Sequence, residues 1–203
     1  MRIISALFFL SVSLPATAQQ SYIIDWDAVG EEAVQHLVDL VRIDTTNPPG
    51  NETRVVEYLE GVLADEGIVS QRFALEPERA NLVARQRGNG SKRPILLMGH
   101  TDVVGVQRDK WYADPFSGQR EDGFVYGRGT LDDKDNLAAA LMVIKLLGRY
   151  GVELDRDVIF LAEAGEEGTP EVGINFMVEK HFDVIDAEYA LAEGGQNIMR
   201  DDR

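Results

Sequence analysis

The side chains that could do chemistry are His100, Asp102, Asp132, Glu166, Glu167 and Glu193. The chain has three histidines and no cysteine, so a transition-metal site would have to use imidazole and carboxylate ligands. That ligand set suits zinc, manganese or cobalt. A pair of carboxylates acting without metal is the other chemistry that these residue types allow.

Most of these residues follow segments that are expected to be strands. Short apolar runs, typical of buried strands, cover residues 94–98, 157–162 and 188–192. Asp132 opens a helix expected over residues 134–149. Open α/β sheets bind ligands at the carboxyl ends of their strands, so we expect the acids and the imidazole to converge there. Several carboxylates in one cleft would repel each other, and two divalent cations would neutralise them.

The first two segments also have structural interpretations. A lone His100 would ordinarily be a buried histidine satisfied by one hydrogen bond. Asp102 lies two residues further on the same side of an extended segment, where its carboxylate could accept the other ring N–H of a ligating imidazole. Asp132 could instead be a helix N-cap, a role for which Asp133 competes. The glycines at 127 and 129 favour a constrained turn that presents Asp132 to a cleft.

The later acids have alternatives of the same kind. Glu166 and Glu167 could be a solvated surface pair, but they follow a buried strand and are framed by glycines. One of them could bind metal while the other transfers protons. Glu193 precedes two glycines and is a weaker signal on its own. His36 belongs to an expected helix and His181 follows one, where it would complement the helix dipole, so we assign both to structure.

Alternating strands and helices predict an α/β fold, a three-layer sandwich with a largely parallel sheet. Helices are expected over residues 27–43, 52–66, 134–149 and 170–180. Strands are expected over residues 68–75, 81–87, 94–98, 157–162 and 188–192, with a hairpin over residues 118–126.

Residues 1–18 read as an export signal. Arg2 is followed by an apolar run, and Ala16-Thr17-Ala18 is a small-x-small cleavage site. We expect cleavage after Ala18, a mature chain in the periplasm or secreted, and no membrane attachment thereafter; a retained anchor is the alternative. The net charge of −15 repels phosphate backbones, so we expect no nucleic-acid partner.

Several motifs together resemble the peptidase M20 family, which includes aminoacylases, succinyl-diaminopimelate desuccinylases and carboxypeptidases. The matching stretches are RIDTTNPPGNE (42–52), MGHTDVV (98–104), Trp111 with DPF (114–116), YGRGTLDDK (126–134), EAGEE (163–167) and ALAEGG (190–195). The resemblance implies a zinc-dependent hydrolase that cleaves an amide bond of small peptides or N-acyl amino acids.

The same resemblance implies a role for each site residue. Two Zn²⁺ ions, with Co²⁺ or Mn²⁺ as alternatives, would be held by His100, Asp132 as a bridge, Glu167 and Glu193. Asp102 would orient His100. Glu166 would be the general base toward a water between the ions.

The resemblance covers only the N-terminal part of such a catalytic domain, here residues 19–203. Relatives of this kind continue through a lid and dimerisation domain, which makes homodimers, and end with a further zinc-binding histidine. Ala192 also stands where carboxypeptidase S-like members have Asp. We therefore expect this polypeptide alone to be a poor or inactive enzyme, and a non-catalytic metal-binding remnant is the alternative function. A carboxylate-pair glycosidase is the third hypothesis.

Overall fold

The structure, a computed structural model, describes residues 22–194. A five-stranded sheet with the order β1-β2-β6-β3-β7 forms its centre. The strands are β1 (Ser70–Ala74), β2 (Ala80–Gln86), β3 (Ile95–His100), β6 (Val158–Glu163) and β7 (Tyr189–Leu191). β3 pairs in parallel with β6 and β7, whereas β2 is antiparallel to both neighbours, β1 and β6. Four of the five strands therefore point the same way, which confirms the expected largely parallel sheet.

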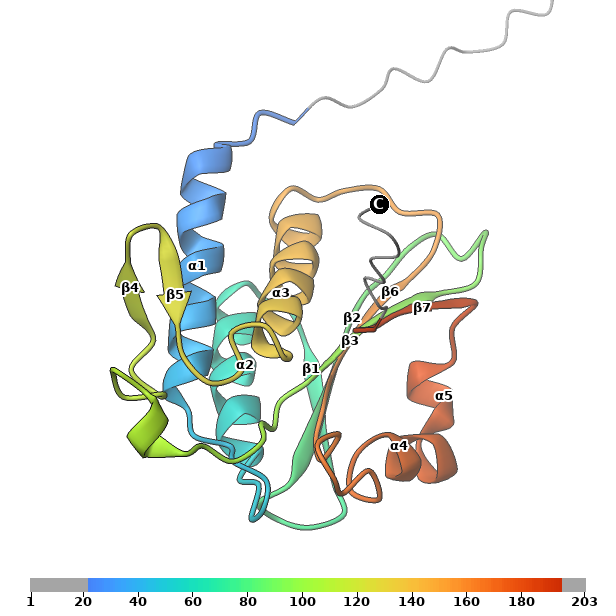
Figure 1. The fold of residues 1–203 in the computed structure, drawn as a ribbon. Helices are drawn as coiled ribbons and strands as arrows, with labels where there is room; N and C mark the ends of the chain where they lie inside the picture. The colour runs from blue at the N-terminus through green and yellow to red at the C-terminus, as the bar shows by residue number, and fades with distance from the viewer. Residues whose placement is uncertain (1–21, 195–203) are drawn as a thin grey trace, which may run out of the picture.

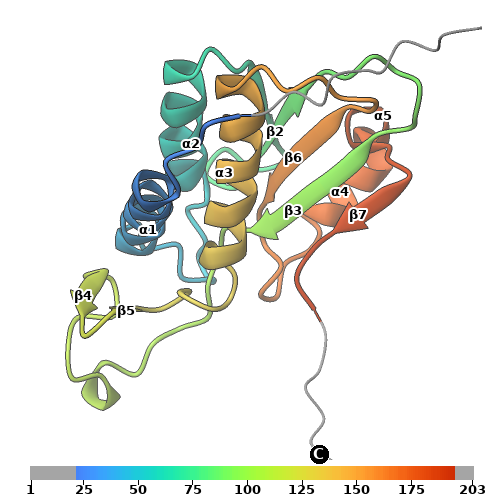
Figure 2. The ribbon, with the colours of Figure 1, turned by 90° about the horizontal axis from the view of Figure 1, so that it is seen from above.

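Helices cover both faces of the sheet (Figure 1). One face carries α1 (Trp26–Arg42), α2 (Thr53–Asp65) and α3 (Lys134–Arg149), and the other carries α4 (Ile174–Lys180) and α5 (Phe182–Ile185). Figure 2 shows the same three layers from above, with the hairpin of β4 (Gln119–Glu121) and β5 (Phe124–Tyr126) beside α1. A short 3-10 helix, η1 (Arg108–Lys110), precedes the hairpin. The three-layer α/β class expected from the sequence is confirmed.

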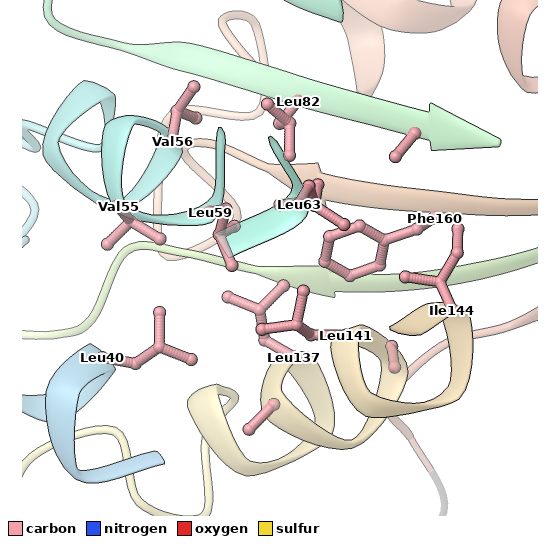
Figure 3. Packing of buried hydrophobic residues seen from close by; sticks show 14 of the residues in the cluster. Leu40, Val55, Val56, Leu59, Leu63, Leu82, Leu137, Leu141, Ile144 and Phe160 are labelled. Carbon is pink, nitrogen blue, oxygen red and sulfur yellow. The ribbon is translucent and has the colours of Figure 1, made fainter. Parts of the chain in front are cut away.

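Strand β6 shows why the sequence folds into layers. All six of its residues are buried, and their side chains alternate between two cores. Phe160 and Ala162 pack with the leucines and valines of α1, α2 and α3 (Figure 3). Ile159 and Leu161 pack with Met177 of α4 and Ile185 of α5 on the opposite face. A continuous apolar strand of this kind is buried on both sides.

The helix expected over residues 170–180 is shorter in the structure, because α4 begins only at Ile174. The Val172 carbonyl accepts a hydrogen bond from Asn81 Nδ2 at 2.8 Å, so it faces β2 and not the next helical turn. Asn81 Oδ1 accepts from the Ala164 N–H at 2.9 Å. One asparagine side chain thus ties both ends of the segment that follows β6.

A buried lysine fixes the start of α3 to the end of α1. The Nζ atom of Lys134 donates to the carbonyls of Leu40 at 2.9 Å and Ile43 at 2.7 Å. These carbonyls belong to the last turn of α1, where an ammonium group also complements the helix dipole. Burial lowers the pKa of Lys134 to about 8. The turn that carries Asp132 is therefore held against a fixed helix end.

The export signal expected in residues 1–18 lies outside the described residues. Within residues 22–194, no helix combines the length and the apolar composition that crossing a bilayer requires.

A polar cluster joins α1, α2 and α3, which lie on one face of the sheet. It lies away from the edge at which β3 and β6 end. Lys145 Nζ, in α3, lies 2.6 Å from Glu32 Oε1 and 2.7 Å from His36 Nε2, both in α1. His36 Nδ1 lies 2.6 Å from the Tyr58 hydroxyl of α2. An ammonium group can only donate, so Nε2 must accept and the ring must be neutral, with its proton on Nδ1. Burial, together with the charge of Lys145, lowers the pKa of His36.

The lowered pKa of His36 predicts a pH-dependent contribution to stability. The unfolded chain takes up a proton on this ring near pH 6.5, whereas the folded chain resists it, so stability falls as the pH drops below about 6.5. In His36→Gln, an amide oxygen still accepts from Lys145 but does not titrate. We expect the loss of unfolding free energy between pH 7.5 and 5.5, measured by urea denaturation, to be smaller in this variant by up to about 1 kcal/mol. Equal losses in both proteins would contradict the assignment.

Candidate metal centre

The site is built on the ends of two neighbouring parallel strands. His100 is the last residue of β3 and Glu163 is the last residue of β6, and the two are in register. Both side chains are buried, and both follow the strand alternation toward the face covered by α4. The Thr101 N–H donates to the Glu163 carbonyl at 2.8 Å, which keeps the two strand ends together. The imidazole therefore projects from the carboxyl edge of the sheet, where sequence analysis expected it.

Carboxylates from three separate segments approach the Nε2 atom of His100. Asp132 Oδ1 lies 3.0 Å from it, Glu193 Oε2 lies 3.5 Å away, and Glu166 Oε2 lies 3.9 Å away. The imidazole is buried, whereas the three carboxylates are partly exposed. Residues far apart in the sequence are thus brought to one point at the sheet edge.

Two groups of three potential ligands share His100. One group contains Asp132 and Glu167, and the other contains Asp133 and Glu193. In each group, one ligand atom per residue lies within 4.8 Å of the others. The structure thus gathers the four metal ligands expected from the sequence, and it adds Asp133.

Asp133 is the site residue that sequence analysis considered only as a helix cap. It occupies the N-cap position of α3, but its side chain makes no capping hydrogen bond. Instead, its Oδ2 accepts from the His100 backbone N–H at 3.1 Å and from Asn136 Nδ2 at 3.3 Å. The sequence signal was present, since two adjacent aspartates precede the helix. Neither carboxylate caps α3, and both face the strand end that bears His100.

A tight turn sets the direction of the two aspartates. Gly129 has a φ of 86°, and the Lys134 N–H donates back to its carbonyl at 2.9 Å. A Cβ atom on Gly129 would lie 2.7 Å from the Val103 side chain, so the close approach also requires glycine. The Arg128 N–H donates to the Pro115 carbonyl at 2.8 Å. The turn is fixed from both sides before the chain enters α3.

Asp102 lies beside the imidazole, but its hydrogen bonds differ from the expectation. The nearest acceptor to His100 Nδ1 is the Asp102 backbone carbonyl at 3.0 Å, and the Asp102 carboxylate is 3.6 Å away. The fully buried carboxylate accepts from the N–H groups of Glu166 and Glu167, both at 3.1 Å, and from Asn47 Nδ2 at 2.8 Å. The expected carboxylate-to-imidazole hydrogen bond is therefore replaced by a carbonyl contact, because three other donors surround the carboxylate.

The acids of the site raise one another's pKa values. Burial and neighbouring carboxylates raise the pKa of Glu163 to about 7, and they also raise the pKa values of Glu167 and Glu193. Burial raises the pKa of Asp133 to about 6. For His100, burial lowers the pKa, but Asp102 and Asp132 outweigh this and raise it to about 10. Negative charge is in excess at this edge of the sheet.

Two buried oxygens show that the donor set fits metal ions. Glu163 Oε2 and Glu167 Oε1 have no hydrogen-bond partner among residues 22–194. Leaving buried carboxylate oxygens without a donor is costly, whereas divalent cations would both neutralise the charge and satisfy such oxygens. Carboxylates with one imidazole are a ligand set used for zinc and for related transition metals.

The other two histidines lie in structural surroundings. His36 belongs to the cluster around Lys145, and the His181 ring packs 4.6 Å from the Phe73 ring and 4.8 Å from the Phe176 ring, measured between centroids.

Buried polar residues at the start of β2 complete this edge. Arg79 and Glu52 form a buried ion pair with an N–O distance of 2.6 Å, beneath the loop that carries Asn47. Because β2 is antiparallel to β6, its first residues lie where β6 and β3 end.

Comparisons with known proteins agree with this geometry. The model of the family described as Peptidase family M20/M25/M40 matches residues 96–200. A probable succinyl-diaminopimelate desuccinylase from Staphylococcus aureus is 36% identical over 171 residues, which cover 83% of this chain and 41% of that protein. The chain thus spans about two fifths of the length of the curated relatives that it matches.

Solved structures share the fold. An M20 family metallo-carboxypeptidase from Sulfolobus solfataricus has a TM-score of 0.70 at 25% identity, covering 81% of this chain and 37% of its own. Human carnosine dipeptidase 1 has a TM-score of 0.71 at 23% identity, with 83% and 39% covered. A dinuclear metal-binding M20 peptidase from Bacillus subtilis has a TM-score of 0.55 at 17% identity, with 75% and 40% covered. With more than half of its residues matched by the family model, the chain belongs to the M20/M25/M40 peptidase family.

Proposed function

We propose that this chain carries the metal centre of a hydrolase that cleaves amide bonds in small peptides or N-acyl amino acids. The observation that carries the proposal is the ring of carboxylates around the Nε2 atom of His100. Names of relatives support the substrate class, since they include a desuccinylase, a metallo-carboxypeptidase and a dipeptidase.

In this proposal, His100, Asp132, Glu167 and Glu193 hold two divalent cations, with Asp132 between them and zinc as the native metal. Asp133 is a further candidate ligand, because it belongs to one of the two groups that share His100. When bound, such ions polarise a carbonyl oxygen and lower the pKa of a water molecule. The chain contributes the ligands: the buried imidazole of His100 and the partly exposed carboxylates beside it.

Glu166 is proposed as the general base. It adjoins Glu167 in sequence, yet it belongs to neither ligand group, and its side chain is 43% exposed. Its Oε2 lies 3.9 Å from His100 Nε2, so it faces the same space as the ligands. A carboxylate in that position can accept a proton from the attacking water and return it to the departing amine.

Residues 19–203 are proposed to be the N-terminal part of the catalytic domain, and residues 1–18 support a proposal of export to the periplasm or beyond. The net charge of −15 argues against a nucleic-acid partner.

Metal analysis tests the ligand assignment. We expect the purified chain, dialysed against excess Zn²⁺ or Co²⁺ and desalted, to retain about two ions, since the proposal assigns His100 and Glu193 to one ion, Glu167 to the other and Asp132 to both. Asp132→Ala removes the proposed bridge and should lower the metal content below one ion per chain. Asp109→Ala, which removes an exposed aspartate outside the site, should retain the wild-type content. Equal metal content in all three proteins would refute the bridging role.

The role of Glu166 predicts a separation of binding from turnover. Glu166→Gln should bind Co²⁺ with an affinity within about twofold of wild type, because Glu166 belongs to neither ligand group. Hydrolysis of dipeptides and N-acyl amino acids, which we expect to be slow in the wild-type chain, should fall by about 10²- to 10⁴-fold in the variant, the usual contribution of a general base. Metal-loaded wild-type chain with no turnover in long incubations would instead favour a non-catalytic metal-binding function.

A further inference from the structure

The carboxylate of Asp102 lies 3.6 Å from His100 Nδ1, but its hydrogen-bond donors are other groups. It is fully buried, and its three hydrogen-bond donors belong to other segments of the chain. Oδ1 accepts from the Glu166 N–H at 3.1 Å, and Oδ2 accepts from the Glu167 N–H at 3.1 Å. The nearest acceptor to the imidazole of His100 is the Asp102 carbonyl, which lies 3.0 Å from its Nδ1.

Asn47 supplies the third donor and extends the contact to a third segment. Its Nδ2 donates to Asp102 Oδ2 at 2.8 Å and to Thr169 Oγ1 at 3.0 Å, which uses both amide hydrogens. Its own backbone N–H donates to the Val103 carbonyl at 2.9 Å. Asn47 is buried, so water does not compete for these hydrogen bonds. The loop that carries Asn47 contributes no proposed metal ligand, but it contacts both the segment that follows β3 and the segment that follows β6.

The two amides held by Asp102 control where Glu166 and Glu167 point. Each N–H group fixes the plane of one peptide, so the two hydrogen bonds fix the peptides on both sides of Glu166. The peptide after Glu167 is fixed by the Gly168 N–H, which donates to the Glu166 carbonyl at 2.8 Å. The turn begins at Gly165, whose φ is 75°, and closes with the Thr169 N–H donating to the Gly165 carbonyl at 2.8 Å. Within this turn, Glu167 has an oxygen directed into the buried site, whereas Glu166 is partly exposed.

We propose that Asp102 and Asn47 are positioning residues that fix the turn of residues 165–169 against the end of β3. Through that turn they separate the proposed general base, Glu166, from the proposed ligand, Glu167. The consequence for metal binding rests on the proposed function, whereas the consequence for the turn does not. This role is additional to any orientation of His100, whose Nδ1 has the Asp102 backbone carbonyl as its nearest acceptor.

The two roles make different predictions for Asn47→Ala and Asp102→Asn. Asn47 does not touch His100, so Asn47→Ala should leave metal binding unchanged if Asp102 only orients the imidazole. Asp102→Asn keeps the backbone carbonyl. It replaces one carboxylate oxygen by an amide N–H₂ group, which cannot accept a hydrogen bond from a backbone N–H. If the turn is held as proposed, both variants should loosen it and weaken metal binding by 10- to 100-fold, as is typical for residues that orient ligands.

Hydrogen–deuterium exchange of the full chain, without added metal, provides the first measurement. We expect the amides of residues 166 and 167 to exchange at least about tenfold faster in both variants, because they lose their acceptor or its support. Co²⁺ titration, followed by its visible absorption, provides the second measurement. Asn47→Ala keeps Asp102 intact and remains informative if Asp102→Asn does not fold.

Asp157→Asn is the matched control. Asp157 directly precedes the first residue of β6. Its carboxylate also accepts hydrogen bonds from a backbone N–H, that of Gly88 at 2.8 Å, and from two arginine side chains. Its substitution should alter neither the exchange of the turn nor the Co²⁺ affinity. Wild-type exchange at residues 166 and 167 in Asn47→Ala and in folded Asp102→Asn would overturn the proposal. A wild-type chain that binds no Co²⁺ would remove the proposed function, while the exchange rates would still decide the positioning role.

Discussion

Mutual repulsion among the acids gathered at the carboxyl edge of the sheet is the constraint to which the rest of this structure responds. Asp132, Glu166 and Glu193 lie within 4 Å of one imidazole nitrogen, and Glu163 and Glu167 have oxygens with no donor among the described residues. Burial and neighbouring carboxylates raise the pKa values of Glu163, Glu167 and Glu193, and like charges this close together oppose folding. His100 relieves part of this repulsion from the centre. Divalent cations would relieve the remainder, which links folding of this edge to metal binding.

The scaffold holds these acids in place without using them as structural contacts. Parallel pairing of β3 and β6 sets His100 beside Glu163, and Lys134 joins the start of α3 to the last turn of α1. The carboxylates that face the imidazole are thereby left free of strong ion pairs with lysine or arginine in the described residues. Such pairs are placed elsewhere, in the Lys145 cluster between the helices and in the Arg79–Glu52 pair beneath the Asn47 loop. Because these ion pairs lie elsewhere, the carboxylates at the sheet edge remain available as metal ligands.

Sequence reasoning was effective wherever strand direction determined position. Apolar runs located β3 and β6, and the carboxyl ends of those strands predicted the convergence of His100 with Glu166, Glu167 and Glu193. Asp133 and Glu163 were missed for a physical reason: a helix-cap position and a strand end each have an ordinary interpretation, and only the three-dimensional register shows that both face the imidazole. The partners of Asp102 were also beyond sequence reasoning. Its acceptor geometry depends on backbone amides of a turn more than sixty residues away.

One reversed strand gives this edge of the sheet a mixed chemical character. The other strands deliver their last residues here, and these include the acids, whereas β2 delivers its first residues, Ala80 and Asn81, directly after Arg79. Guanidinium and amide groups therefore enter from the opposite chain direction and serve the loops around the acids. An all-parallel sheet would have to recruit such donors from its connecting segments. The direction of β2 thus determines which chemical groups can stabilise the loops at the edge where β3 and β6 end.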